Sequence, residues 1–168
     1  MKQVSFRNDI LPLKDKLYRL ALRITLNPAE AEDVVQETMI KVWNRRDNWG
    51  TIDNIETFCL TACRNLAIDK TRHMANQTIS LETEMEPSDN SHHANPEEQT
   101  IQQDRIQMVR QLIDQLPEKQ RSCMQLRDIE GKSYKDIATI LAITEEQVKI
   151  NIFRARQTIR EQFKKIDT

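Results

Sequence analysis

The chain has 168 residues, of which only two are glycine, and its 25 Lys or Arg nearly balance its 26 Asp or Glu. Many helix-forming residues with almost no glycine predict an all-α fold and argue against glycine-rich loops that cradle phosphate groups. The charge is unevenly spread, because residues 73–104 hold seven acids and no Lys or Arg, whereas residues 147–165 hold six Lys or Arg and one acid. This distribution argues against a general DNA-coating protein but leaves a basic C-terminal segment.

Three helices are predicted in the N-terminal part of the chain. Apolar residues in 5–26 recur at alternating spacings of three and four, which places them on one side of a helix. Asn27 followed by Pro28 is typical of a helix start, and this second helix should end near residue 46. A loop over residues 47–53 and a third helix over 54–73 follow. Three such helices can close a small core.

The middle of the chain has the composition of a linker. Residues 75–96 are polar and acidic, lack a hydrophobic period and contain two prolines. Two helices are expected next, over 97–116 and from Pro117 to Gly131, where the glycine suits a left-handed helix end. We therefore predict two small helical domains, residues 1–75 and 97–168, joined by a flexible acidic linker over 76–96.

The last third of the chain has the pattern of a helix-turn-helix. A short amphipathic helix after Ser133, a tight turn at residues 142–144 and a longer helix capped by Thr144 follow one another. Ala142 in the turn should adopt a left-handed conformation at a cost on the order of 1 kcal/mol. On the second helix, four polar side chains share the face opposite the apolar stripe, where they could contact base edges: Gln147, Asn151, Arg154 and Thr158. Lys149 and Arg156 flank that face, and the candidates for phosphate contacts are Lys149, Arg156 and Arg160.

Two long segments resemble one known family. The string LPEKQRSCMQLRDIEGKSYKDIATILAITEEQVKINIFRARQTI resembles the fourth conserved region of sigma factors of the extracytoplasmic-function group. AEAEDVVQETMIKVWNRR and IETFCLTACRNLAIDKTR look like the second conserved region. The resemblance implies a sigma factor without catalysis of its own, which directs core RNA polymerase to specific promoters and initiates DNA-templated transcription. Gln147 and Asn151 depart from frequent family residues, which should change the upstream promoter element that is read.

The resemblance also assigns roles within the N-terminal domain. That domain would bind the polymerase core and melt the downstream promoter element, while the C-terminal domain would bind the upstream one. The family docks a second-region helix on a coiled coil of the polymerase, and the matching outer positions here are Asp33, Gln36, Glu37 and Ile40. Two acids, an amide and an apolar side chain suit a basic helical partner, although an ordinary solvated face has the same composition.

Opening of the downstream element would fall to the third helix and the loop before it. The candidate DNA-binding residues there are Trp49, Arg64, Asn65, Lys70 and Arg72. Trp49 could stack on an extruded base or fold over the small core, and Asn65 could contact DNA or remain a surface residue or local cap. Both alternatives remain open at the level of the sequence.

Other functions are less well supported by the residues. Cys59 and Cys63 share a helix face and could bind zinc with His73 or with His92 and His93, but packing is the simpler interpretation, so no metal or cofactor is predicted. Neither a signal peptide nor a membrane span is recognisable, which predicts a cytoplasmic chain with reduced thiols and no membrane insertion. A free-standing dimeric activator or repressor is the main rival, and an enzyme a weaker one. The expected partners are core RNA polymerase and promoter DNA, and the resemblance also implies an anti-sigma factor, which the sequence does not reveal.

Overall fold

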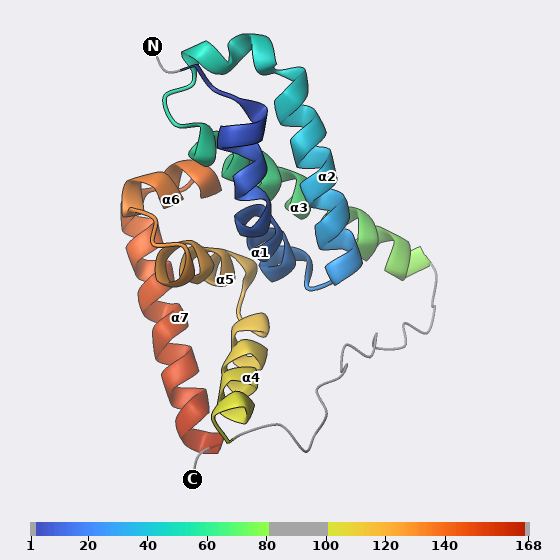
Figure 1. Ribbon diagram of the computed structural model, residues 1–168. Helices are drawn as coiled ribbons and strands as arrows, with labels where there is room; N and C mark the ends of the chain where they lie inside the picture. The colour runs from blue at the N-terminus through green and yellow to red at the C-terminus, as the bar shows by residue number, and fades with distance from the viewer. Residues whose placement is uncertain (1–2, 81–100, 167–168) are drawn as a thin grey trace.

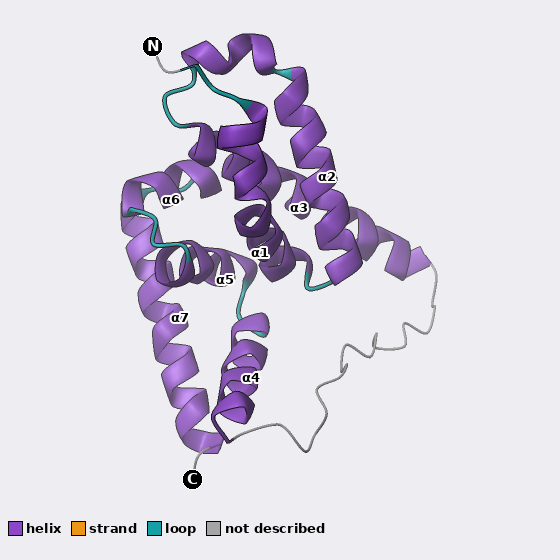
Figure 2. Ribbon diagram, viewed as in Figure 1, coloured by secondary structure: helices purple, strands orange, loops and turns teal. Residues whose placement is uncertain are grey.

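The computed structural model describes residues 3–80 and 101–166, and within these ranges the chain is helical with no strand (Figures 1 and 2). The N-terminal half begins with two short helical turns and continues with three helices: η1 (Phe6–Ile10), η2 (Leu11–Leu13), α1 (Lys14–Thr25), α2 (Pro28–Asn44) and α3 (Ile55–Ser80). The C-terminal half holds α4 (Ile101–Asp114), α5 (Glu118–Met124), η5 (Gln125–Ile129), α6 (Tyr134–Leu141) and α7 (Glu145–Ile166). This confirms the all-α class and the two helical halves.

The N-terminal half is a three-helix bundle whose start and stop signals act as predicted. Asn27 caps α2, with its side-chain oxygen accepting hydrogen bonds from the backbone N–H groups of Ala29 (3.0 Å) and Glu30 (3.2 Å). Between α2 and α3, where a loop was predicted, the structure has a 3-10 segment, η3 (Arg46–Thr51). The apolar stripes of α1 and α2 are buried against α3, which forms the core of this half.

One predicted boundary and one predicted pattern of burial differ from the structure. The third helix continues to Ser80, so residues 76–80 of the predicted linker are helical. The rest of that linker, including His92 and His93, lies outside the described residues. In α4, Ile101 and Met108 have a spacing that predicts burial on one side of the helix, yet both are exposed, because the described elements cover this helix at its C-terminal turns, where Leu112 is buried.

The C-terminal half contains the expected helix-turn-helix. Ser133 caps α6 by accepting from the N–H of Asp136 (3.1 Å), and Gly131 has a φ of 71°. Ala142 ends α6 in the left-handed conformation, with a φ of 56°, which permits the tight turn into α7. Val148, Ile152 and Ala155 of α7 are buried, as their spacing predicts.

The two halves pack directly against each other. α6 lies against α3 and α5 lies against α1, and buried residues from both halves form one continuous hydrophobic cluster (Figure 1). Arg121 of α5 donates from Nε to the carbonyl oxygen of Arg23 (2.8 Å) and from Nη1 to that of Leu116 (2.9 Å), so one guanidinium satisfies helix ends from both halves. This packing joins segments that are about a hundred residues apart in the sequence.

Ion pairs reinforce the contact between the halves. Arg19 of α1 makes a two-pronged contact with Glu130, at 2.8 Å for each hydrogen bond. Arg23 pairs with Asp114 (2.6 Å), and the Glu56 carboxylate accepts from both Lys16 (2.8 Å) and Lys132 (2.6 Å). The interface between the halves therefore combines a buried apolar cluster with several ion pairs, one of which includes the nearly buried side chain of Glu130.

Candidate nucleic-acid and polymerase interfaces

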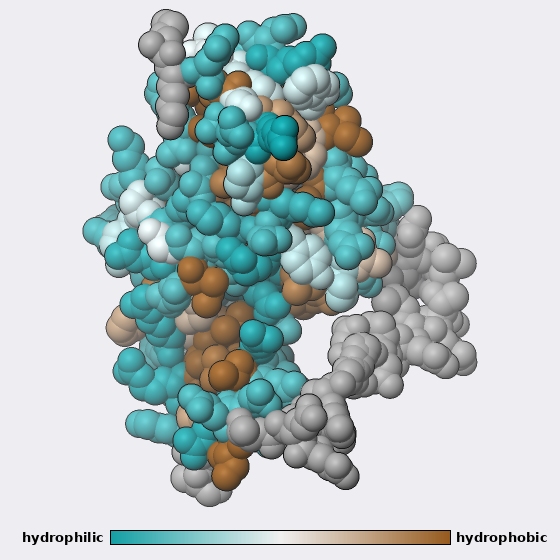
Figure 3. Space-filling model, in the orientation of Figure 1, coloured by the Kyte–Doolittle hydropathy of each residue, from teal (hydrophilic) through white to brown (hydrophobic). Residues whose placement is uncertain are grey.

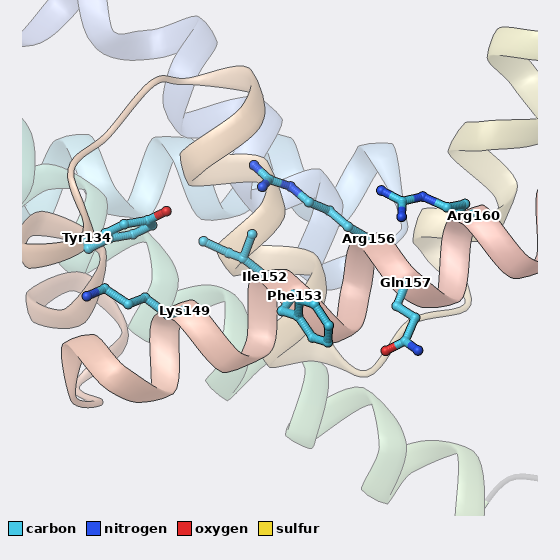
Figure 4. A pocket seen from close by; sticks show the side chains of 7 residues that line it. All are labelled: Tyr134, Lys149, Ile152, Phe153, Arg156, Gln157 and Arg160. Carbon is cyan, nitrogen blue, oxygen red and sulfur yellow. The ribbon is translucent and has the colours of Figure 1, made fainter.

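Helix α7, the second helix of the helix-turn-helix, presents a basic and aromatic groove to solvent. The groove is lined by Tyr134, Lys149, Ile152, Phe153, Arg156, Gln157 and Arg160 (Figure 4). The Lys149 ammonium lies 5.5 Å from the centre of the Tyr134 ring, and the Arg127 guanidinium lies 4.4 Å from it. Phe153 is 67% exposed, although it is large and apolar. Tyr134 and Phe153 were not among the predicted site residues, although aromatic side chains beside a basic helical face are a signal that the sequence contains.

Two predicted base-reading side chains also stabilise their own helix. The Thr144 hydroxyl accepts from the Gln147 N–H (3.1 Å), and the Gln147 carbonyl oxygen Oε1 accepts from the Thr144 N–H (3.0 Å). This is the predicted capping box, formed reciprocally. Asn151 donates from Nδ2 to the Gln147 backbone carbonyl (2.8 Å). Gln147 can still donate from its amide group, and Asn151 can still accept through its side-chain oxygen.

The remaining predicted residues of α7 differ in how firmly they are held. Arg154 is exposed and extends from the helix surface. Arg156 forms a two-pronged pair with Asp128 of η5, and this pairing raises the pKa of the guanidinium further above its ordinary value. The Asp128 carboxylate therefore fixes the position of the Arg156 guanidinium. A DNA phosphate would have to displace this carboxylate or share the guanidinium with it.

The polymerase-docking candidates form an exposed surface on α2. Asp33, Gln36 and Glu37 are exposed, and Ile40 is 60% exposed. They occupy the side of the helix opposite Val34, Thr38 and Val42, which are buried. The structure therefore brings all four predicted residues together on one accessible face.

The DNA-opening candidates are more dispersed. Asn65 and Arg72 are exposed on α3. Arg64 is mostly buried and faces the C-terminal half, where its Nη2 lies 3.6 Å from Glu118 Oε2. Lys70 faces α2, with Nζ 3.1 Å from Asp33 and 3.4 Å from Glu37. These contacts raise the pKa of Lys70, although burial alone would lower it. The predicted docking and DNA-binding residues thus meet at Lys70.

Trp49 occupies the core position that was one of its two alternatives. It is 8% exposed, and its indole Nε1 donates to the Val42 carbonyl oxygen at 3.0 Å. Trp43 is the exposed aromatic of this region, at 44%, and contacts Trp49 edge to face at a centroid distance of 6.0 Å. The placement favours a packing role for Trp49, because its ring has no free face for a base.

The cysteines lie in the core. Cys59, Cys63 and Cys123 are buried free thiols, and burial raises the pKa of each to about 12. Within residues 3–80 and 101–166, no group of three or more His, Cys, Asp or Glu is arranged to hold a metal ion. Nor does any helix in these ranges have the length and apolar character needed to cross a membrane.

Comparisons with known proteins agree with this architecture. The sigma-70 region 2 family matches residues 10–76, and the sigma-70 region 4 family matches residues 106–159. The chain is 30% identical over 161 residues to the RNA polymerase sigma-H factor of Pseudomonas aeruginosa, covering 90% of this chain and 83% of that protein. It is 32% identical over 145 residues to the extracytoplasmic-function sigma factor SigL of Mycobacterium tuberculosis, covering 86% and 80%.

Solved structures show the same fold. The sigma factor RpoE of Bartonella quintana, crystallised with the anti-sigma factor NepR, superposes with a TM-score of 0.79 at 24% identity, covering 97% of this chain and 98% of that one. CnrH in complex with the cytosolic domain of CnrY superposes with a TM-score of 0.67 at 17% identity, covering 95% and 87%. With two conserved regions in order, full-length relatives and a shared fold, the chain belongs to the extracytoplasmic-function group of RNA polymerase sigma factors.

Proposed function

We propose that the two halves of this sigma factor divide promoter recognition between them. The chain directs RNA polymerase to promoters, as its family does. In our proposal the C-terminal half binds the upstream element by inserting α7 into the major groove. The observation that carries this is the exposed face of α7, where Gln147, Asn151 and Arg154 follow one another on a helix presented by a helix-turn-helix.

Phosphate contacts would orient α7 on the duplex. Lys149 and Arg156 flank the proposed reading face and line the basic groove with Arg160 (Figure 4). Such contacts fix position without carrying sequence information, so they should set affinity rather than promoter choice.

The N-terminal half would bind polymerase and open the downstream element. The exposed α2 face of Asp33, Gln36, Glu37 and Ile40 combines negative charge with an apolar side chain, which suits a basic helix of the partner. Asn65, Lys70 and Arg72 on α3 would contact the DNA strand. Arg64 and Trp49 support this half from within in the described conformation, because both are packed.

An anti-sigma factor is a proposed further partner. The two structural relatives above are complexes of a sigma factor with such a protein or with the cytosolic domain of CnrY. In this chain a groove runs between α1, α4, α5, η5 and α7. Its apolar lining residues are Leu22, Val109, Ile113, Met124, Ile129 and Ile159, and its polar and charged ones are Arg19, Arg23, Arg110, Gln125 and Asp128. Figure 3 shows hydrophobic side chains gathered in the lower half of the displayed face. A groove of this kind suits an amphipathic helix. We place the chain in the cytoplasm, where it would meet polymerase, and assign it no catalytic step of its own.

Run-off transcription tests the proposal. Core RNA polymerase with this chain should initiate from a discrete set of promoters in a random library, and core alone should not. Ile40→Glu should abolish polymerase binding, whereas Ile101→Glu, at a more exposed isoleucine (76%) outside the proposed interfaces, should leave it intact. If core polymerase gains no activity but the chain alone binds a palindromic duplex, the activator function replaces the one proposed here.

A further inference from the structure

Lys70 lies between the two proposed surfaces of the N-terminal half. It projects from α3 toward α2, and its Nζ is 3.1 Å from Asp33 Oδ2, 3.4 Å from Glu37 Oε1 and 3.7 Å from Glu30 Oε2. Its side chain is only 21% exposed. A single ammonium is therefore enclosed by three carboxylates from one helix.

The three acids differ in how a partner could reach them. The side chains of Asp33 and Glu37 are 60% and 52% exposed and belong to the proposed docking face. Glu30 is more enclosed, and its Oε2 is buried without a hydrogen-bond partner in the described part of the chain. A basic protein surface could thus take over the two outer carboxylates, while the inner one would remain beside Lys70.

The charge balance around Lys70 opposes DNA binding in the free chain. Three carboxylates outweigh one ammonium, so an approaching phosphate meets a net negative cluster. A cationic partner on Asp33 and Glu37 would neutralise that excess and release two of the three contacts that hold Nζ. Docking would then make the surface around Lys70 attract a DNA phosphate instead of repelling it.

We propose that Lys70 couples polymerase docking to DNA binding: in the free chain the α2 carboxylates withhold its ammonium, and docking of a basic polymerase surface on Asp33 and Glu37 makes it available to a DNA phosphate. The inference rests on the docking role proposed above for α2. It explains why a promoter-binding residue should lie against the polymerase-binding face. The chain would grip single-stranded DNA only after it has joined polymerase.

The first test uses the free full-length chain and a short fluorescent single-stranded DNA of mixed sequence. Asp33→Asn with Glu37→Gln should mimic docking. Because one added phosphate contact on single-stranded DNA contributes a salt slope of about 0.7, we expect about fivefold tighter binding at about 0.1 M salt, and a correspondingly steeper salt dependence. In a Lys70→Gln background this gain should vanish.

A matched control separates this effect from a general loss of negative charge. Glu32→Gln with Asp15→Asn removes two acids from a neighbouring groove between α1 and α2, lined also by Lys14 and Tyr18. The control should tighten binding far less. An equal gain in the control, or a gain that persists without Lys70, would show a non-specific charge effect and overturn the coupling.

The second test compares the free and polymerase-bound forms. Lys70→Gln should weaken single-stranded DNA binding by the polymerase complex by a larger factor than it weakens binding by the free chain, and Lys70→Arg should restore binding in the complex. Circular dichroism melting of each variant verifies that the helices are intact. If the parent chain does not bind polymerase, both the docking role of α2 and the coupling through Lys70 are overturned. A chain that binds polymerase but shows no dependence on Lys70 would overturn the coupling alone.

Discussion

At the scale of single residues, side chains that look functional in the sequence often hold the fold together. Trp49 fills the end of the three-helix core and satisfies the Val42 carbonyl at the last turn of α2. Its sequence position, in a polar segment before α3, is equally typical of a base-stacking aromatic. The sequence could not decide between the two roles, because the answer depends on which way η3 turns the ring.

Replacing Trp49 should therefore reduce stability first. Trp49→Ala should lower the free energy of unfolding by about 3 kcal/mol, because it leaves a cavity and removes one of the two hydrogen bonds to the Val42 carbonyl, the other coming from the Arg45 N–H. Trp43→Ala, at the partly exposed neighbour, should cost clearly less. Urea titrations followed by circular dichroism measure both values. Equal losses for the two variants would contradict the core role of Trp49.

The turn of the helix-turn-helix carries a strained alanine. Ala142 has a φ of 56°, where a β-carbon is unfavourable. Ala142→Gly should raise the free energy of unfolding by about 0.5–1 kcal/mol. The opposite change is expected for Ala138→Gly, because Ala138 lies inside α6. Denaturant midpoints of the two variants should move in opposite directions, and a shared direction would show that φ is not the cause.

At the scale of elements, the sequence was most informative where caps and apolar stripes coincide. The starts of α2, α6 and α7 follow from Asn27, Ser133 and Thr144, because a side-chain oxygen at a helix start acts locally. The exposed Ile101 shows the limit of periodicity, since a stripe indicates a side of the helix but not how much of it a neighbour covers. No strong helix-stop signal follows residue 73, so the sequence does not predict where α3 ends.

The two roles of Gln147 can be separated on α7. Gln147→Glu retains an acceptor for the Thr144 N–H and adds a negative charge at a helix N-terminus, so stability should stay within about 0.5 kcal/mol of the parent chain. The same charge lies on the proposed DNA-binding face and should reduce run-off transcription by at least about tenfold. Thermal melting and transcription together test this. Unchanged transcription would remove Gln147 from the reading face.

At the scale of the whole molecule, the packing of the two halves was beyond the reach of the sequence. Arg19 and Glu130 are 111 residues apart in the chain, and no local pattern links them. The two helical halves and the family were predictable because each rests on contiguous motifs. The interface between them depends on pairings of surface charges, and many such pairings are equally compatible with the composition.

This interface should weaken in acid. Burial alone would raise the pKa of Glu130, but hydrogen bonds from Arg19 and Gln125 outweigh it and lower that pKa below the ordinary 4.5. Glu56 behaves in the same way through Lys132 and Lys16. A lowered folded-state pKa gives stability that is present above pH 4.5 and lost as the pH falls through the folded-state pKa.

The measurement is the free energy of unfolding at pH 7 and at successive values below 4.5. The parent chain should lose more stability over this interval than Glu130→Gln, which has no carboxylate to protonate at that site. Glu161→Gln, at an exposed carboxylate on α7 that is hydrogen-bonded to Gln157 of the same helix (3.5 Å), serves as the control and should follow the parent. Parallel curves for the parent and Glu130→Gln would show that the ion pair contributes nothing.

The rate at which the buried cysteines are alkylated reports on local opening of the molecule. Burial raises the pKa of each thiol to about 12, so the reactive thiolate is scarce at neutral pH, and burial also shields the sulfur from reagents. Alkylation must therefore wait for local opening. Cys59 and Cys63 report on the three-helix bundle, and Cys123 reports on the half that carries α7. Mass spectrometry of timed alkylation would reveal whether one half opens before the other, without any introduced label.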